Sequence, residues 1–224
     1  MNDLFFIAGA QRSGTTYLCH LLDEHPEIEL ATPLSPEPKF FSRDDLFKLG
    51  REYYEKNYFQ GKPGARIRGE KSVCYMESET SASRIAQVYP AAKIIFLLRN
   101  PIDRAISNYR FSLQNGLESL PMDQAFYQEG KRLKDFDPQK ISVSPFAYLS
   151  RGKYIDYIPV FENYFPQENI LIILLEKLFD KPEILKNIYG FLGVDPDFTP
   201  SSLNKVVNSS LGDNEMISKE LLEY

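Results

Sequence analysis

Short, unbroken apolar runs separated by polar segments dominate the pattern of this chain. The longest lie within Leu4–Ala8, Lys93–Leu98 and Ile170–Leu175. A run of this length, bounded by polar or turn-forming residues, predicts a strand buried on both faces, as in a parallel sheet. Two shorter stretches, Ile28–Leu30 and Ile67–Lys71, are predicted to be extended as well.

Apolar or aromatic residues at helical spacing fill most segments between these strands. They predict helices over Thr15–Asp23, Arg51–Phe59, Ser78–Val88, Ile102–Gln114, Tyr154–Tyr164 and Pro182–Leu192, and a last one near Ile217–Tyr224. The proline-rich stretch Ala31–Lys39 is predicted as a loop, and residues 116–142 as helix and loop. Strands that alternate with helices indicate an α/β fold with a mostly parallel sheet, here in a single domain spanning residues 1–224.

Composition and charge narrow the class of protein. With 43% hydrophobic and 25% charged residues, the chain resembles an ordinary globular domain. Its net charge of -5 disfavours nucleic-acid binding, which needs a basic excess. No apolar run approaches the roughly 20 residues of a membrane span. Because the first predicted strand follows Met1-Asn2-Asp3 directly, we expect no signal peptide and predict a cytoplasmic protein.

Residues that commonly bind metals are few. The sequence has two cysteines, Cys19 and Cys74, and two histidines, His20 and His25. Isolated cysteines make neither a disulfide framework nor a metal site, so we favour burial as small hydrophobic side chains. We therefore predict no metal site.

The segment Gly9–Thr16, GAQRSGTT, follows the first predicted strand and opens the first predicted helix. A glycine loop at a helix N-terminus directs backbone N–H groups at an anion, and the helix dipole adds to the attraction. The Thr15 and Thr16 hydroxyls and the Arg12 guanidinium can also donate to phosphate oxygens. Nucleoside triphosphatases have a lysine where this chain has Thr15, so a kinase is disfavoured.

Three chemically rich segments coincide with the carboxyl ends of predicted strands. They are Gly9–Thr16, Glu70–Ser72 and Arg99–Pro101. In open α/β sheets, ligands bind in the crevice outside these strand ends. The sequence therefore predicts that the three segments meet in one binding site.

These segments resemble those of sulfotransferases that use 3′-phosphoadenosine 5′-phosphosulfate (PAPS). Gly9–Leu18 is similar to the family's 5′-phosphosulfate loop, with Arg12 where lysine is common, and Lys93–Ser107 is similar to its 3′-phosphate segment. Glu70–Ser72 resembles the Glu-Lys-Ser/Thr segment of heparan-type members. Further look-alikes are Glu37–Phe41, Gly152–Tyr154, Leu174–Leu178 and Phe191–Gly193.

The resemblance implies a P-loop-NTPase-like three-layer fold, with PAPS as donor, 3′,5′-ADP as product and no required metal. It assigns Arg99 and Ser107 to the 3′-phosphate, and Arg12 also to the charge that develops on the leaving group. The residues implied to hold the 5′-phosphosulfate are Gln11, Arg12, Ser13, Gly14, Thr15 and Thr16. The resemblance covers Phe5 to about Gly193, and the chain stops at Tyr224 inside what resembles the family's last helix region, so we expect a few functional residues in a tail beyond it.

Glu70 is the general base that the resemblance implies, and in-line transfer would place it across a cleft from Arg12. Lys39 and Lys71 are candidates for binding the acceptor, although Lys71 could equally form an ion pair and Lys39 could be solvated. The predicted reaction moves a sulfuryl group to a hydroxyl or amine of a glycan, lipid or small molecule. Two alternatives are a P-loop kinase for a nucleotide or small alcohol, and a non-catalytic nucleotide-binding protein.

Overall fold

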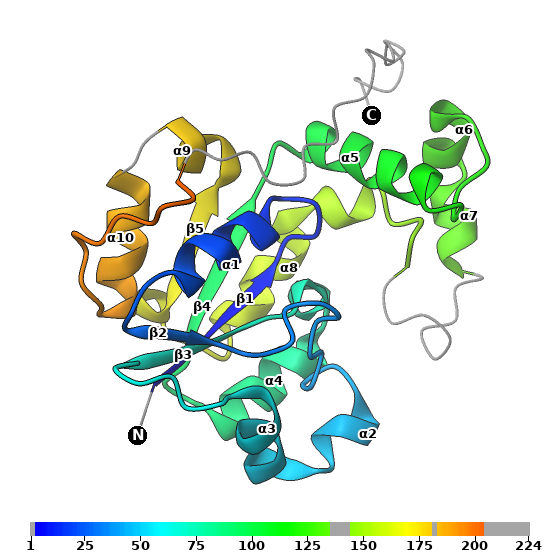
Figure 1. Cartoon of the computed structure of the whole chain (residues 1–224). Helices are drawn as coiled ribbons and strands as arrows, with labels where there is room; N and C mark the ends of the chain where they lie inside the picture. The colour runs from blue at the N-terminus through cyan, green and yellow to red at the C-terminus, as the bar shows by residue number, and fades with distance from the viewer. Residues whose placement is uncertain (1–2, 135–143, 181–182, 204–224) are drawn as a thin grey trace. The chain divides into compact units, whose positions relative to one another are not determined.

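The computed structural model describes residues 3–134, 144–180 and 183–203. Five strands form one sheet in the order β2-β3-β1-β4-β5, and all four pairings are parallel (Figure 1). The strands are β1 (Asp3–Gly9), β2 (Ile28–Leu30), β3 (Ile67–Lys71), β4 (Lys93–Leu98) and β5 (Ile170–Leu174). The predicted α/β fold with a parallel sheet is therefore confirmed.

The two central strands are apolar on both faces because helices cover both faces. Residues Leu4–Ala8 of β1 and Ile94–Leu98 of β4 are all buried. After β1 the chain runs to β2 at one edge of the sheet, whereas after β4 it runs to β5 at the opposite edge. The switch point, where ligands bind in such sheets, therefore lies between the carboxyl ends of β1 and β4.

Two compact units make up the chain, one formed by Met1–Arg99 with Tyr154–Lys205 and the other containing Asn100–Lys153. The first holds the sheet. Its helices are α1 (Thr15–Asp23), α2 (Asp44–Phe47), α3 (Gly50–Tyr58), α4 (Glu79–Val88), α8 (Tyr154–Glu162), α9 (Leu175–Asp180) and α10 (Glu183–Leu192). Two 3₁₀ turns, η1 (Val73–Glu77) and η3 (Gln167–Asn169), complete it.

Aromatic contacts show which helices share a face of the sheet. The Tyr189 ring of α10 lies 4.6 Å from that of His25, just after α1, so these two helices cover one face. On the other face Phe96 of β4 meets Phe161 of α8 at 5.0 Å, and Phe6 of β1 meets Tyr89, the C-cap of α4, at 6.3 Å. This arrangement gives the predicted three layers.

The second unit is helical in its described residues. It contains α5 (Pro101–Gln114), α6 (Met122–Tyr127), α7 (Glu129–Lys134) and the 3₁₀ turn η2 (Ser150–Gly152). Its core is formed by Ala105, Tyr109, Met122, Ala125, Phe126 and Tyr148. A buried carboxylate, Glu118, pairs with Arg132 at 2.6 Å and accepts a hydrogen bond from the Tyr148 hydroxyl at 2.7 Å.

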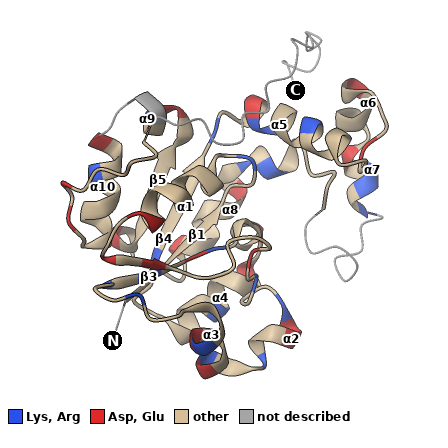
Figure 2. Ribbon diagram, viewed as in Figure 1, with Lys and Arg blue, Asp and Glu red and all other residues tan. Residues whose placement is uncertain are grey.

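Most predicted elements are observed within one or two residues of their bounds, and α8 contains Pro159 as expected. The short helices α2 and α9 were not predicted, and the predicted helix near Ile217–Tyr224 lies outside the described residues. Acidic and basic residues are mixed on α3 (Figure 2), as in the 2.7 Å pair of Arg51 with Glu55. None of the helices in the described ranges is long and apolar enough to cross a bilayer.

Candidate active site

The loop between β1 and α1 is fixed at both ends and leaves a helix N-terminus open. The Ala10 amide donates to the Leu97 carbonyl of β4 at 2.8 Å, which ties the loop to the switch point. Gly14 precedes α1 with φ 78°, and a β-carbon there would lie 2.5 Å from Leu175 Cδ1, so only glycine fits. No side chain caps α1, which leaves its first amides available to an anion.

The polar side chains of the loop are largely turned inward. Ser13 is fully buried, and its hydroxyl has no hydrogen-bond partner among the residues that the structure describes. Thr15 is buried, whereas Gln11 and Thr16 are half-buried. A buried, unsatisfied hydroxyl beside open amides fits a bound phosphate, which would accept from both.

Arg12 and Arg99 come from the ends of adjacent strands and interact with each other. Burial, and then repulsion from the Arg99 guanidinium, lower the pKa of Arg12. Arg99 follows β4, and its carbonyl accepts a hydrogen bond from the Tyr154 hydroxyl at 2.9 Å. Two guanidiniums whose charges repel each other favour an anion between or beside them.

Ser107, the other residue predicted to bind the 3′-phosphate, is buried on α5 of the second unit. Arg99 belongs to the first unit. Their joint action on one phosphate therefore stays a prediction.

Glu70 lies inside the first unit rather than at the loop. Its register partner is Phe6, and neighbouring residues in parallel strands point to the same face, here the one that packs on Phe41 and Tyr75. The carboxylate is 0% exposed and accepts hydrogen bonds from the hydroxyls of Tyr54 (2.6 Å), Ser72 (2.6 Å) and Tyr75 (2.7 Å). This burial does not support the predicted position across a cleft from Arg12.

Burial raises the pKa of Glu70 from 4.5 to about 7, even though the hydroxyls of Ser72, Tyr54 and Tyr75 act in the opposite direction. A raised pKa means that the folded protein binds this proton more tightly than the unfolded chain. The resulting stability is present below pH 4.5 and is lost as the pH rises through about 7.

We therefore expect the wild type to lose stability relative to Glu70→Gln between pH 5 and pH 8, by up to about 3 kcal/mol. The measurement is urea unfolding of both proteins across this range. Glu168→Gln, which changes an exposed carboxyl, is the control and should show no such trend. A pH-independent difference between wild type and Glu70→Gln would show that Glu70 is ionised as easily as in water.

Lys71 points to the opposite face of β3 and reaches the loop. Its Nζ lies 3.4 Å from Thr16 Oγ1 and 3.2 Å from Glu37 Oε1. The other oxygen of Glu37 accepts from the Val73 amide at 3.1 Å, and the Glu37 side chain is 15% exposed. The ion pair weighed for Lys71 is thus present, but it joins a partly exposed carboxylate to the phosphate loop.

Glu37 is the functional candidate to which sequence reasoning gave no role. The available signal was the look-alike segment Glu37–Phe41, whose two aromatic residues are buried. Lys39 in the same segment is half-buried, with φ 53°. Its role in binding an acceptor stays a prediction.

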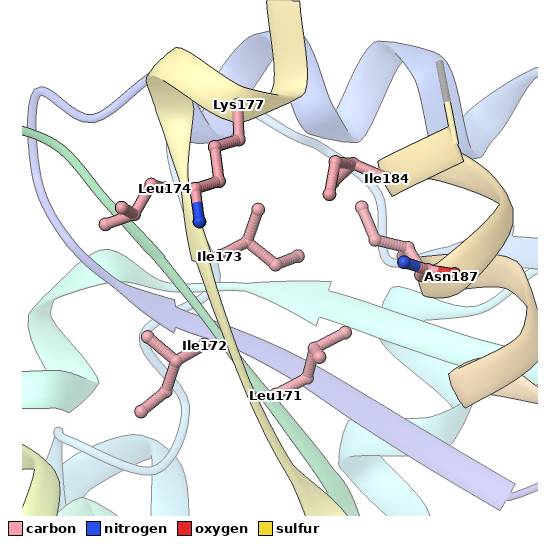
Figure 3. A pocket seen from close by; sticks show the side chains of 8 residues that line it. Leu171, Ile172, Ile173, Leu174, Lys177, Ile184 and Asn187 are labelled. Carbon is pink, nitrogen blue, oxygen red and sulfur yellow. The ribbon is translucent and has the colours of Figure 1, made fainter. Parts of the chain in front are cut away.

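A separate cavity of about 190 Å³ lies along the outer strand β5. Its walls come from β5, α9 and α10 and are aliphatic apart from Lys177 and Asn187 (Figure 3). The described residues contain no group of three or more His, Cys, Asp or Glu that could hold a metal.

Comparison with known proteins gives consistent matches. Residues 2–215 match the family model described as a sulfotransferase domain. A bifunctional heparan sulfate N-deacetylase/N-sulfotransferase 2 from Bos taurus is 31% identical over 199 residues, which cover 86% of this chain but only 22% of that protein. The chain therefore spans about a fifth of the length of this relative.

Solved structures agree with the fold. A crystal structure of a sulfotransferase from Alicyclobacillus acidocaldarius superposes with a TM-score of 0.78 at 28% identity, covering 94% of this chain and 87% of the other. Mouse sulfotransferase SULT7A1, complexed with PAP, gives a TM-score of 0.56 at 21% identity, covering 87% and 60%. The second match supports the fold alone.

Proposed function

Because the chain belongs to the sulfotransferase family, we propose that it moves a sulfuryl group from PAPS to a hydroxyl or amine of a glycan or small-molecule acceptor. The cytoplasmic location stays a prediction.

The observation that carries the proposal is the pair of guanidiniums at the switch point. Arg12 precedes the open N-terminus of α1, and Arg99 follows β4 next to it. A nucleotide with a 5′-phosphosulfate and a separate 3′-phosphate offers one anion to the loop and another to Arg99. A kinase is less well supported, because Thr15 occupies the position of the lysine that contacts the β- and γ-phosphates.

Bound PAPS would supply the activated sulfuryl group. The loop amides and the hydroxyls of Ser13, Thr15 and Thr16 would hold its 5′-phosphate. Arg12 would stabilise the negative charge that develops on the bridging oxygen as the bond to sulfur breaks. This role would explain why the cation of the loop is Arg12, before Gly14, rather than a lysine at the position of Thr15.

Glu37 is the better candidate for the base. It would take the proton from the acceptor as the acceptor oxygen or nitrogen attacks sulfur. Its carboxylate is partly exposed and is linked through Lys71 to Thr16 of the loop, whereas the Glu70 carboxylate is enclosed by three hydroxyls. A proton acceptor must reach the reacting group, and a partly exposed carboxylate meets this requirement without rearrangement.

Nucleotide binding tests the two phosphate sites. At a concentration of about 100 times its Kd, 3′,5′-ADP is expected to raise the melting temperature by on the order of 5–10 °C. At the same concentration 5′-AMP should raise it less, because only 3′,5′-ADP has a 3′-phosphate for Arg99. The measurement is a thermal-shift titration, with ATP and magnesium as the competing cofactor.

Arg99→Ala should abolish the difference between the two nucleotides. Arg66→Ala removes a surface guanidinium of the same unit and is the matched control. Equal stabilisation of the wild type by 3′,5′-ADP and 5′-AMP would contradict the 3′-phosphate site. Stronger stabilisation by ATP with magnesium would favour a kinase.

A further inference from the structure

Besides the direct contact of Glu37 with Lys71, two hydroxyl groups link the loop that carries Glu37 to Glu70 of β3. The Lys39 amide donates to Ser72 Oγ at 2.9 Å, and the Ser72 hydroxyl donates to Glu70 Oε1 at 2.6 Å. The Phe41 amide donates to the Tyr75 hydroxyl at 3.1 Å, and that hydroxyl donates to the same Glu70 oxygen at 2.7 Å. Each series of two hydrogen bonds runs from a backbone amide through a hydroxyl to Glu70 Oε1. We call the two series the relays.

The relays are isolated from water, which strengthens them. Glu70, Ser72 and Tyr75 are each 0% exposed. A hydrogen bond to a carboxylate in such surroundings is stronger than one at the surface, and each hydroxyl is polarised by the carboxylate that it faces. A third hydroxyl, that of Tyr54, donates to Glu70 Oε2 but belongs to α3 and reaches no amide of the loop.

The backbone of residues 39–41 has an unfavourable conformation that these hydrogen bonds would stabilise. Lys39 has φ 53°, a conformation that a residue with a side chain rarely adopts. Side-chain packing fixes the same stretch, since the Phe41 ring meets Phe6 at 5.4 Å and the Phe40 ring meets Tyr54 at 4.8 Å. Glu37 lies two residues before Lys39, and its own oxygens face Lys71 of β3 and the Val73 amide of η1.

We propose that Glu70 is a positioning residue that sets the place of Glu37 through the two relays. The inference rests on the proposed function, in which Glu37 accepts the proton of the acceptor. Glu70 itself touches no reacting group. Its carboxylate accepts the hydrogen bonds that fix the backbone amides of Lys39 and Phe41. This fixed backbone keeps Glu37 next to Lys71, which contacts Thr16 of the Gly9–Thr16 loop.

The test uses the full chain with Ser72→Ala and Tyr75→Phe, each of which cuts one relay. Tyr54→Phe is the matched control, because it also removes one hydroxyl from Glu70 but leaves both relays intact. Ser72→Thr restores the hydroxyl on an extended backbone that suits a β-branched residue. Retained binding of 3′,5′-ADP shows that each variant is folded.

Two readouts are expected to change together. Amide hydrogen exchange should rise about 10-fold at Lys39 in Ser72→Ala and at Phe41 in Tyr75→Phe, and stay near wild type in Tyr54→Phe. Turnover with radiolabelled PAPS should fall by on the order of 10- to 100-fold in the two cut variants, with KM for PAPS within about twofold of wild type. The acceptors assayed are an N-unsubstituted glucosamine oligosaccharide and para-nitrophenol. Ser72→Thr should recover most of the rate.

The Glu37→Gln background separates this inference from the proposed base. There, cutting either relay should change turnover by less than about twofold, since the positioned group is already lost. Unchanged exchange in both cut variants, or an equal turnover loss in Tyr54→Phe, would overturn the inference. Wild-type turnover in Glu37→Gln alone would instead overturn the proposed base, while exchange would still report whether the relays hold the loop.

Discussion

Glu37→Gln is expected to lower turnover by roughly 10²–10⁴ while 3′,5′-ADP affinity stays near wild type, because a positioned base contributes about this factor. Glutamine keeps the size of the side chain and can still accept from the Val73 amide, but it cannot take up a proton. The measurement is transfer of radiolabelled sulfuryl from PAPS, combined with calorimetric titration of 3′,5′-ADP.

Glu70→Gln is the informative comparison for this result. One amide oxygen at the position of Oε1 can still accept from Ser72 and Tyr75, so we expect a loss of no more than about 10-fold. The reverse order, with Glu70→Gln slow and Glu37→Gln fast, would return the role of base to Glu70 and require the buried carboxylate to become accessible during the reaction.

Arg12→Ala is expected to lower turnover by roughly 10²–10³, the usual loss when a group that stabilises developing charge is removed. Affinity for 3′,5′-ADP should fall less, by about 10-fold, because the loop amides and Arg99 would still hold the two phosphates. Single-turnover kinetics and nucleotide titration measure the two losses separately.

Two variants complete that experiment. Arg12→Lys keeps the charge and should retain most of the affinity, whereas its rate reports how far the forked guanidinium matters. Arg43→Ala changes an arginine that pairs with Asp45 at the surface and should leave both quantities unchanged. A loss of affinity in Arg12→Ala without any loss of rate would restrict Arg12 to phosphate binding.

The central strands β1 and β4 could be predicted because each is short, buried and apolar throughout, whereas β5, also predicted to be buried on both faces, leaves Ile172 and Leu174 exposed at the edge of the sheet. Burial on both faces leaves no polar position, so runs such as Ile94–Leu98 reveal the strand and its environment together. The helix α9 was missed for a related reason. The apolar run of β5 continues into Leu175, where the helix already begins, so periodicity alone cannot mark that boundary.

The positions of the Gly9–Thr16 loop and of Arg99 at strand ends could also be predicted, since a loop after a strand and a residue at a strand end are local features. The assignment of Glu70 and Lys71 to faces could not. Alternation requires that they point to opposite sides, but which side carries α1 depends on the packing of Phe6 and Tyr75. Glu37 lies within the proline-rich loop Ala31–Lys39, and its partner Lys71 is far along the sequence, so no local pattern predicts the position of Glu37.

The guanidinium pair has a consequence for the reaction cycle. Sulfuryl transfer removes neither the 5′-phosphate nor the 3′-phosphate, so the spent nucleotide keeps the groups that the loop and Arg99 are proposed to hold. The same contacts that select the donor therefore retain the product. Under this scheme the rate of the enzyme in a cell depends on the ratio of fresh to spent nucleotide, and clearance of 3′,5′-ADP becomes as important as the supply of PAPS.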